Sequence, residues 1–288
     1  MTFRKRRDAL RSILSGSACV RPGSVYDAIS IRIAEDIGFE VGMFGGSVAS
    51  LAVLGDPDIA LITLTELAEQ MRRMSRASAL PVLVDADHGY GNALNIRRTV
   101  QELETAGAAG LTIEDTLLPQ VYGQAKPQLI SLEEGVGKMK AALDGRGDPS
   151  LVIVGRTGAA SITSLDDTIA RARAYEATGV DALFFTGIKT RSELEAIAAA
   201  TTLPIVLGGA PEEMSDPDYL RDRRVRIGLQ GHAPIAAATQ AVYEILKALR
   251  EGLSPKDLKR LASSELTNKV TRDADVKARL AIFLGLRR

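Results

Sequence analysis

The chain of 288 residues is long enough for one large domain or two small ones. Its 36 basic and 36 acidic side chains cancel, so the net charge gives no electrostatic reason to expect a nucleic-acid partner. Aromatic residues make up 4% of the chain and Trp is missing, which argues against a platform for stacking bases. The single cysteine, Cys19, excludes an intrachain disulfide and a cysteine-rich metal site, and it fits a cytoplasmic protein.

The chain begins with a basic run, Arg4-Lys5-Arg6-Arg7. Residues 8–14, which follow it, are amphipathic and charged rather than continuously apolar. A solvated first helix is therefore a better interpretation than a secretory signal. No stretch approaches the ~18 uninterrupted apolar residues of a membrane span, so we expect no membrane partner.

Short apolar runs alternate with longer helix-like segments along the chain. A weak strand candidate near residues 18–21 is followed by clearer ones at residues 41–45, 81–85, 110–114, 151–156, 182–186, 204–208 and 226–230. The alternation of strand and helix predicts a parallel sheet. About eight such units are what a closed (β/α)8 TIM barrel needs, and a doubly wound open sheet is the alternative.

The intervening segments have helical periodicity, most clearly at residues 96–105, 165–178 and 191–200. We expect residues 1–288 to form one barrel domain, with 254–288 as a C-terminal helical extension. Within the extension, residues 256–264 and 273–283 look helical. Their apolar positions need a surface to cover, either on a neighbouring subunit or on their own barrel.

The run Asp85-Ala86-Asp87-His88-Gly89-Tyr90-Gly91-Asn92 follows the apolar strand candidate at residues 81–85. Two carboxylates one residue apart need a cation, a shared proton or a solvated loop. A hard divalent cation such as Mg²⁺ suits oxygen ligands of this kind. The alternative is a plain strand-to-helix loop in which an Asp caps the helix.

Polar residues follow five of the predicted strands, which is the catalytic pattern of such a barrel. They are Ser47, the pair Asp85 and Asp87, Glu114, Arg156 and His232. Singly, Ser47 could cap a helix, Glu114 could pair with a lysine, and His232 could be a satisfied core histidine. Together, the three carboxylates can hold Mg²⁺ directly or through water, and the arginine offers a fork for an anion. This set suits a small anionic 2-oxo acid whose enolate a metal would stabilise.

These residues carry a family resemblance. The segments Gly45-Gly46-Ser47, Asp85 to Asn92, Thr112-Ile113-Glu114-Asp115 and Gly155-Arg156-Thr157 resemble the isocitrate lyase / phosphoenolpyruvate mutase superfamily, in order, over most of the chain. Within it, Asn92-Ala93-Leu94-Asn95 and Gly231-His232-Ala233 are most similar to the bacterial oxaloacetate decarboxylases.

The resemblance implies a (β/α)8 enzyme that depends on Mg²⁺, with Mn²⁺ as a possible substitute. It also implies a homotetramer, built as a dimer of dimers, in which the last helix is exchanged between subunits. It implies Asp85 as the principal metal residue, Asp87 and Glu114 acting through water, and Asp58 as a further acidic neighbour. It also implies substrate contacts from Ser47, Arg156 and His232, the last two being the catalytic candidates.

The chain departs from the superfamily pattern in the loop after Glu114-Asp115. The lyases carry a catalytic cysteine there, whereas Tyr122 stands in the cysteine place, Gly123 follows it, and Gln124 stands in the histidine place of this mobile loop. Gly158 also replaces the usual Asp or Asn, and Gly208-Gly209 lacks a bulky polar residue.

The missing thiol favours decarboxylation of oxaloacetate to pyruvate and CO₂ over carbon–carbon cleavage. One rival is a lyase for a substituted malate or methylisocitrate-like acid, with Tyr122 as the acid. Another is a non-catalytic 2-oxo-acid binder that keeps the metal site.

Overall fold

The structure is a computed structural model that describes residues 3–286. The chain divides into two compact units, Met1–His232 and Ala233–Arg288. The first unit contains one eight-stranded sheet whose strands pair in chain order, each parallel to the next. The strands are β1 (Gly23–Ser24), β2 (Gly42–Phe44), β3 (Val82–Asp85), β4 (Gly110–Glu114), β5 (Val152–Thr157), β6 (Ala182–Phe185), β7 (Ile205–Leu207) and β8 (Val225–Gly228).

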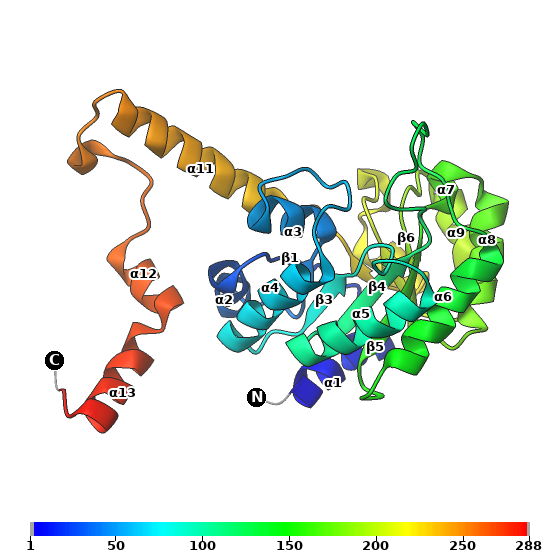
Figure 1. Ribbon diagram of the computed structural model, residues 1–288, viewed down its shortest axis with the longest axis horizontal. Coiled ribbons are helices and arrows are strands. Elements are labelled where there is room, and N and C mark those ends of the chain that lie inside the picture. Colours follow the sequence, from blue (N-terminus) through cyan, green and yellow to red (C-terminus); the bar gives the residue numbers. More distant parts are fainter. Residues whose placement is uncertain (1–2, 287–288) are drawn as a thin grey trace. The chain divides into compact units, whose positions relative to one another are not determined.

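The two ends of this sheet meet at Val20. Its N–H donates to the Arg226 carbonyl at 2.9 Å, and its own carbonyl accepts from the Gly228 N–H at 3.0 Å. The sheet therefore curls into the TIM-barrel fold that the sequence predicts (Figure 1). The expected strand at 18–21 is wrong in position, because Val20 makes only an isolated bridge and β1 begins at Gly23.

One helix precedes the sheet of the first unit and helices follow each strand from β1 to β7, as the alternation predicts. They are α1 (Phe3–Ser15), α2 (Ala28–Asp36), α3 (Gly46–Val53), α4 (Leu64–Ala77), α5 (Ala93–Ala106), α6 (Leu132–Gly145), α7 (Ala159–Ile162), α8 (Leu165–Glu176), α9 (Arg191–Ala200), η1 (Glu212–Met214) and α10 (Pro217–Asp222). The predicted helices at 96–105 and 191–200 are confirmed, and α8 accounts for most of 165–178.

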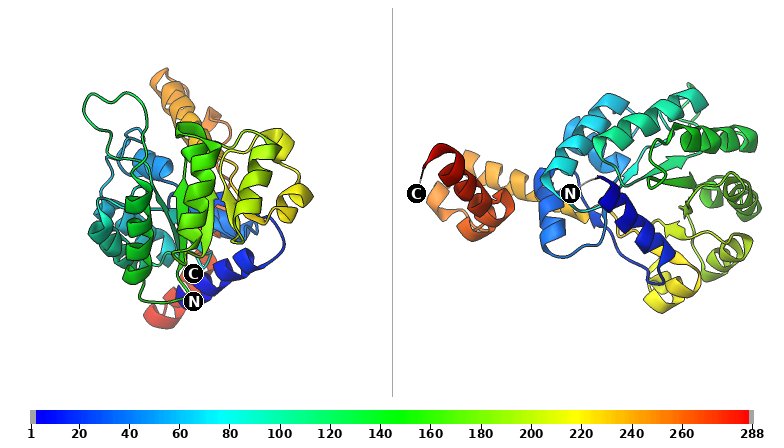
Figure 2. Two further views of the ribbon diagram at one scale, coloured as in Figure 1. Left: turned by 90° about the vertical axis from the view of Figure 1, so that its right-hand side faces the viewer. Right: turned by 90° about the horizontal axis from the view of Figure 1, so that it is seen from below.

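The first helix differs from the expected solvated one, because one face of α1 is buried. Leu10 and Leu14 belong to the same hydrophobic cluster as Val152 and Val154 of β5. Seen from below, α1 lies across this end of the barrel (Figure 2). Burial of apolar surface stabilises a fold by about 25 cal/mol per Å², so α1 contributes to the core rather than being a solvated helix.

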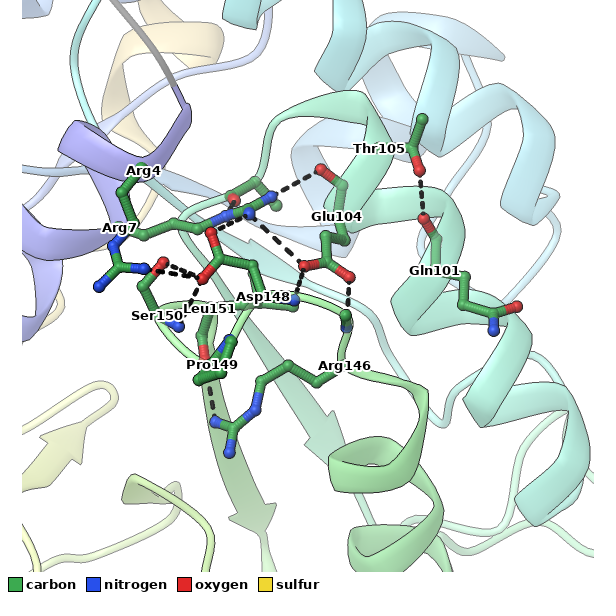
Figure 3. Close-up of polar contacts among 12 residues, drawn as sticks. Arg4, Arg7, Gln101, Glu104, Thr105, Arg146, Asp148, Pro149, Ser150 and Leu151 are labelled. Carbon is green, nitrogen blue, oxygen red and sulfur yellow. Dashed lines mark hydrogen bonds and ion pairs between the residues drawn. The ribbon is translucent and has the colours of Figure 1, made fainter.

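Buried charge also fixes α1 in place. The Arg7 guanidinium donates to Asp148 Oδ2 at 2.9 Å and to the Glu104 carbonyl at 2.8 Å, while Glu104 accepts the backbone N–H of Asp148 at 2.7 Å (Figure 3). Hydrogen bonds from the Ser150 backbone and hydroxyl hold the pKa of Asp148 at about 2. These contacts close the end of the barrel opposite to the carboxyl ends of the strands.

The second unit is helical. It consists of α11 (Ala233–Arg250), η2 (Pro255–Asp257), α12 (Ser264–Thr271) and α13 (Asp273–Leu284). The helix predicted at 256–264 is wrong, since Leu258 is extended and Arg260 has a positive φ of 59°, which interrupts a helix. The helix predicted at 273–283 is confirmed as α13. Within residues 3–286, no helix is both long and apolar enough to cross a bilayer.

Candidate active site

A cavity of about 380 Å³ opens at the carboxyl ends of the strands. It brings together five of the predicted site residues: Ser47, Asp58, Asp85, Arg156 and His232. Its other lining residues are Met43, Gly45, Phe184, Thr186, Gly187, Gly208, Gly209, Leu229 and Gly231. The carboxyl ends of barrel strands are where catalytic groups of this fold gather.

Arg156 of β5 is the centre of the charged cluster. Its Nη1 lies 2.6 Å from Asp85 Oδ2, and its Nη2 lies 3.1 Å from Glu114 Oε2. The pairing follows from the register, because Glu114 of β4 stands opposite Arg156 in the sheet. Two of the five N–H donors of the guanidinium serve these pairs and Arg156 lines the cavity, so further donors remain for a ligand. The Arg156 Nε is buried without a hydrogen-bond partner among the described residues.

Asp85 is held from a second side. Its Oδ1 accepts the Thr112 hydroxyl at 3.0 Å and the Asp87 backbone N–H at 3.2 Å. Asp87 itself has a positive φ of 47°, and a Cβ on Gly46 would lie 2.5 Å from its Oδ1. The glycine at the start of α3 thus lets the Asp87 carboxylate approach the backbone closely.

Crowding of carboxylates perturbs their protonation. Burial raises the pKa of Glu114 to about 7, although the nearby Arg156 charge opposes the shift. Burial, followed by the charges of Asp85, Glu114 and Asp58, raises the pKa of Asp87 well above its usual range. Partial burial and the Asp85 charge also raise the pKa of Asp58. Four carboxylates against one guanidinium form a site whose charge favours a cation.

The donor set fits Mg²⁺ held largely through water. Within the described residues, no three His, Cys, Asp or Glu side chains are arranged to hold a metal ion directly. Mg²⁺ keeps several waters and needs only one or two carboxylates, so a closed cage is not required. Asp85 lines the cavity and Asp87 and Glu114 do not, although all three residues are 7% exposed. The division between direct and water-mediated metal contacts that the sequence resemblance implies stays a prediction.

His232 follows β8 and lines the cavity beside Gly45. Its Nδ1 lies 2.8 Å from the Ser24 hydroxyl of β1, and a Cβ on Gly45 would lie 2.8 Å from its Nε2. Burial lowers the pKa of His232, with Asp85 and Asp58 opposing the shift. The imidazole is therefore neutral at pH 7 and can offer a single ring N–H.

The segment between β4 and α6 projects from the barrel (Figure 2). Its base is fixed, because Arg171 of α8 donates to Asp115 Oδ2 at 2.9 Å and to the Ile130 carbonyl at 3.1 Å. Its tip is open, and Tyr122 is fully exposed. Tyr122, Gly123 and Gln124 do not line the cavity in this conformation, so closure of the loop stays a prediction.

Several contributing residues escape sequence reasoning. Lys138 of α6 is buried and donates to the His88 carbonyl at 2.9 Å, bracing the loop that carries Asp87. The Arg156 guanidinium lies 5.1 Å from the centre of the Phe184 ring, within reach of a cation–π interaction. A Cβ on Gly208 would lie 2.9 Å from that ring, so Gly208 makes room for Phe184 rather than only widening the pocket.

Fold and site together define a TIM-barrel enzyme with an acidic centre at the carboxyl ends of its strands. The chain belongs to the phosphoenolpyruvate phosphomutase family, whose model matches residues 10–250. This confirms the resemblance seen in the sequence. Among curated relatives, a protein of Bradyrhizobium diazoefficiens named oxaloacetate decarboxylase is 81% identical over all 288 residues, covering 100% of both chains. One of Rhodopseudomonas palustris (strain BisB5) with the same name is 76% identical over the same length.

Solved structures agree on the fold. A phosphonopyruvate hydrolase in complex with oxalate and Mg²⁺ superposes with a TM-score of 0.85 at 27% identity, covering 97% of this chain and 99% of that one. A 2,3-dimethylmalate lyase of the phosphoenolpyruvate mutase/isocitrate lyase superfamily superposes at 0.83 with 23% identity, covering 98% and 99%.

Proposed function

We propose that this protein decarboxylates oxaloacetate to pyruvate and CO₂ as a carboxy-lyase. The observation that carries the proposal is 81% identity, along the full chain, to a relative named oxaloacetate decarboxylase. The cavity supports it, since Arg156, Asp85 and His232 all line it and together suit a small dianion bound beside a cation. The loop after Glu114-Asp115 also supports the proposal, because it has no cysteine where the carbon–carbon lyases of the superfamily carry theirs.

Asp85 would hold Mg²⁺, with Asp87, Glu114 and Asp58 contributing through water. When bound, the ion supplies a Lewis acid that draws electron density from the 2-oxo group. The phosphonopyruvate hydrolase crystallised with oxalate and Mg²⁺ supports this cofactor, because its chain has the same fold at 27% identity. Mn²⁺ satisfies the same oxygen donors.

The chain's own residues bind and orient the substrate. Arg156 keeps Nη N–H donors beyond those that pair with Asp85 and Glu114, and these bind a substrate oxygen in the cavity that Arg156 lines. The first backbone N–H groups of α3, at Gly46 and Ser47, have no partner within the helix and suit an anionic oxygen. His232 lines the cavity beside the start of α3, with its Nε2 next to Gly45. Loss of the distal carboxylate as CO₂ leaves an electron pair that spreads onto the 2-oxo oxygen, and C3 then takes a proton.

We also propose that the second unit joins subunits of a homotetramer. Its helices expose large apolar side chains at Val242, Tyr243, Leu246, Ile282 and Phe283. Exposed apolar patches of this kind mark protein–protein contacts. A second copy of the chain is the expected partner, and light scattering during size-exclusion chromatography measures the number of subunits.

The proposed activity is tested with a panel of acids. Pyruvate or glyoxylate release is measured with oxaloacetate, a methylmalate and methylisocitrate, each with Mg²⁺ and with EDTA. We expect pyruvate from oxaloacetate above the metal-only rate with Mg²⁺, and only the spontaneous rate in EDTA. Cleavage of a malate without oxaloacetate turnover selects the lyase instead. Ligand-induced stabilisation without turnover of any acid selects a binder.

A further inference from the structure

Ser24 is the contact that fixes the His232 ring. The hydroxyl oxygen of Ser24 lies 2.8 Å from His232 Nδ1. The backbone of Ser24 is held in β1, where Ser24 stands opposite Met43 of β2, so the hydroxyl is presented from a rigid strand. On the other side of the ring, the missing side chain of Gly45 leaves room for Nε2, which faces the cavity.

This contact has two possible directions, and they give His232 opposite chemistry. If Ser24 donates its proton to Nδ1, the neutral ring carries its proton on Nε2 and offers an N–H to the cavity. If Nδ1–H donates to Ser24, the ring presents a lone pair to the cavity instead. A lone pair repels a carboxylate, whereas an N–H binds one.

The surroundings favour the first direction. Burial lowers the pKa of His232, so the ring has one proton to place rather than two. The charges that face it, Asp58 and Asp85, are negative, and they attract an N–H at the cavity side of the ring. A serine hydroxyl can serve as donor or acceptor, so it imposes no cost on this choice.

We propose that Ser24 is a positioning residue that donates to Nδ1 and thereby holds neutral His232 as its Nε2–H tautomer, an uncharged hydrogen-bond donor to the substrate carboxylate. The inference rests on the proposed function in that the ligand is a small dianion. It makes His232 a binding group and assigns it no part in carrying the proton to C3. Ser24 acts through His232 and touches no substrate itself.

Nitrogen-15 NMR of the imidazole reads the tautomer directly. The chain contains only 2 histidines. The His232→Gln variant therefore shows the imidazole signals of His88, and the wild-type signals that it lacks belong to His232. In the substrate-free protein at neutral pH we expect Nε2 protonated and Nδ1 not. We expect Ser24→Ala to mix the two tautomers and Ser24→Thr, which keeps the hydroxyl, to restore the first. A ring protonated on Nδ1, or one unchanged in Ser24→Ala, overturns the proposal.

Binding and kinetics give a second reading. We expect Ser24→Ala to weaken oxalate binding and to lower kcat/KM about tenfold, mostly by raising KM, the effect of one lost hydrogen bond. In the His232→Gln background the same change should have no further effect. An equal loss in both backgrounds means that Ser24 acts elsewhere and contradicts the proposal.

The matched control is Ser75→Ala. Ser75 of α4 is a buried serine whose hydroxyl donates to the Ala106 carbonyl at 2.7 Å, away from the cavity. It should lower the melting temperature without altering oxalate affinity or the His232 signals. Because the NMR reading needs no turnover, it remains decisive even if oxaloacetate is not the substrate. Failure of the decarboxylase assay and failure of the tautomer prediction are therefore separate results.

Discussion

Arg156 and Asp85 come from β5 and β3, two strands apart, and their side chains meet at 2.6 Å above β4, where Glu114 completes a three-residue cluster. Burial alone would lower the pKa of Arg156, but the charges of Asp85 and Glu114 outweigh it and raise that pKa. The guanidinium is therefore permanently charged. It stabilises two carboxylates that would otherwise repel each other, and the proposed function assigns its remaining Nη N–H donors to the substrate.

Removal of this guanidinium should damage both stability and activity. In Arg156→Met, Asp85 and Glu114 lose their counter-charge, and we expect unfolding free energy to fall by about 3 kcal/mol. We expect kcat/KM for oxaloacetate to fall about a hundredfold or more. Urea unfolding and pyruvate formation measure the two effects. Arg173→Met on the outer face of α8 is the control, and equal losses in both variants would contradict a special place for Arg156.

The raised pKa of Glu114 predicts how stability depends on pH. A carboxyl whose folded pKa is raised from about 4.5 to about 7 stabilises the fold fully below pH 4.5. That stabilisation is lost as the pH rises through about 7. In EDTA, Glu114→Gln should therefore become more stable relative to the wild type between pH 5 and pH 8. Melting temperatures across that range test this.

Glu133→Gln, at an exposed position in the first turn of α6, is the control for the pH series. Its difference from the wild type should stay constant. A Glu114→Gln difference that shrinks as the pH rises would mean that the folded pKa is lowered rather than raised.

The Asp87 carboxylate lies so close to the backbone of Gly46 that no larger residue should fit at position 46. In Gly46→Ala the new Cβ would fall 2.5 Å from Asp87 Oδ1, so the carboxylate must move. We expect the Mg²⁺ concentration for half-maximal rate to rise about tenfold or more, since second contacts to a metal site typically contribute that much. Gly137→Ala in α6 meets nothing within 4 Å and should leave the metal dependence unchanged. Unaltered metal dependence in Gly46→Ala would show that Asp87 is not part of the metal site.

Tyr122 separates decarboxylation from lyase chemistry. Its side chain is fully exposed at the loop tip, and decarboxylation does not require it as an acid. Tyr122→Phe should keep oxaloacetate turnover within about threefold of the wild type, because a surface hydroxyl contributes little. Steady-state kinetics measures this. A loss of a hundredfold or more would instead make Tyr122 a proton donor.

The sequence predicts the barrel and its charged residues because both depend on local patterns. Apolar runs of strand length mark β2 to β8, and Asp85, Glu114 and Arg156 stand near the carboxyl ends of their strands, where the fold brings their side chains together. The two-residue β1 is too short to leave a pattern, so its position, and with it Ser24, is missed. The partners Lys138 and Phe184 are missed for another reason, since their contacts form only when distant segments pack.

Two errors show where local patterns fail. The α1 sequence looks like a solvated basic helix, but Arg7 finds Glu104 and Asp148 far along the chain and becomes buried. Residues 256–264 have helical spacing of leucines, yet the positive φ at Arg260 ends any helix there. Tertiary contacts and backbone conformation override spacing in both cases.

The most direct test of the account is the initial rate of pyruvate formation from oxaloacetate by the wild type and by Asp85→Asn at the same free Mg²⁺ concentration, with the metal-only rate subtracted. The neutral amide keeps the shape of the side chain but loses the charge that pairs with Arg156 and attracts the ion. We predict a protein-dependent rate in the wild type and a loss of about a hundredfold or more in Asp85→Asn. A wild-type rate no greater than that of Mg²⁺ alone, or equal rates for the two proteins, would contradict the account.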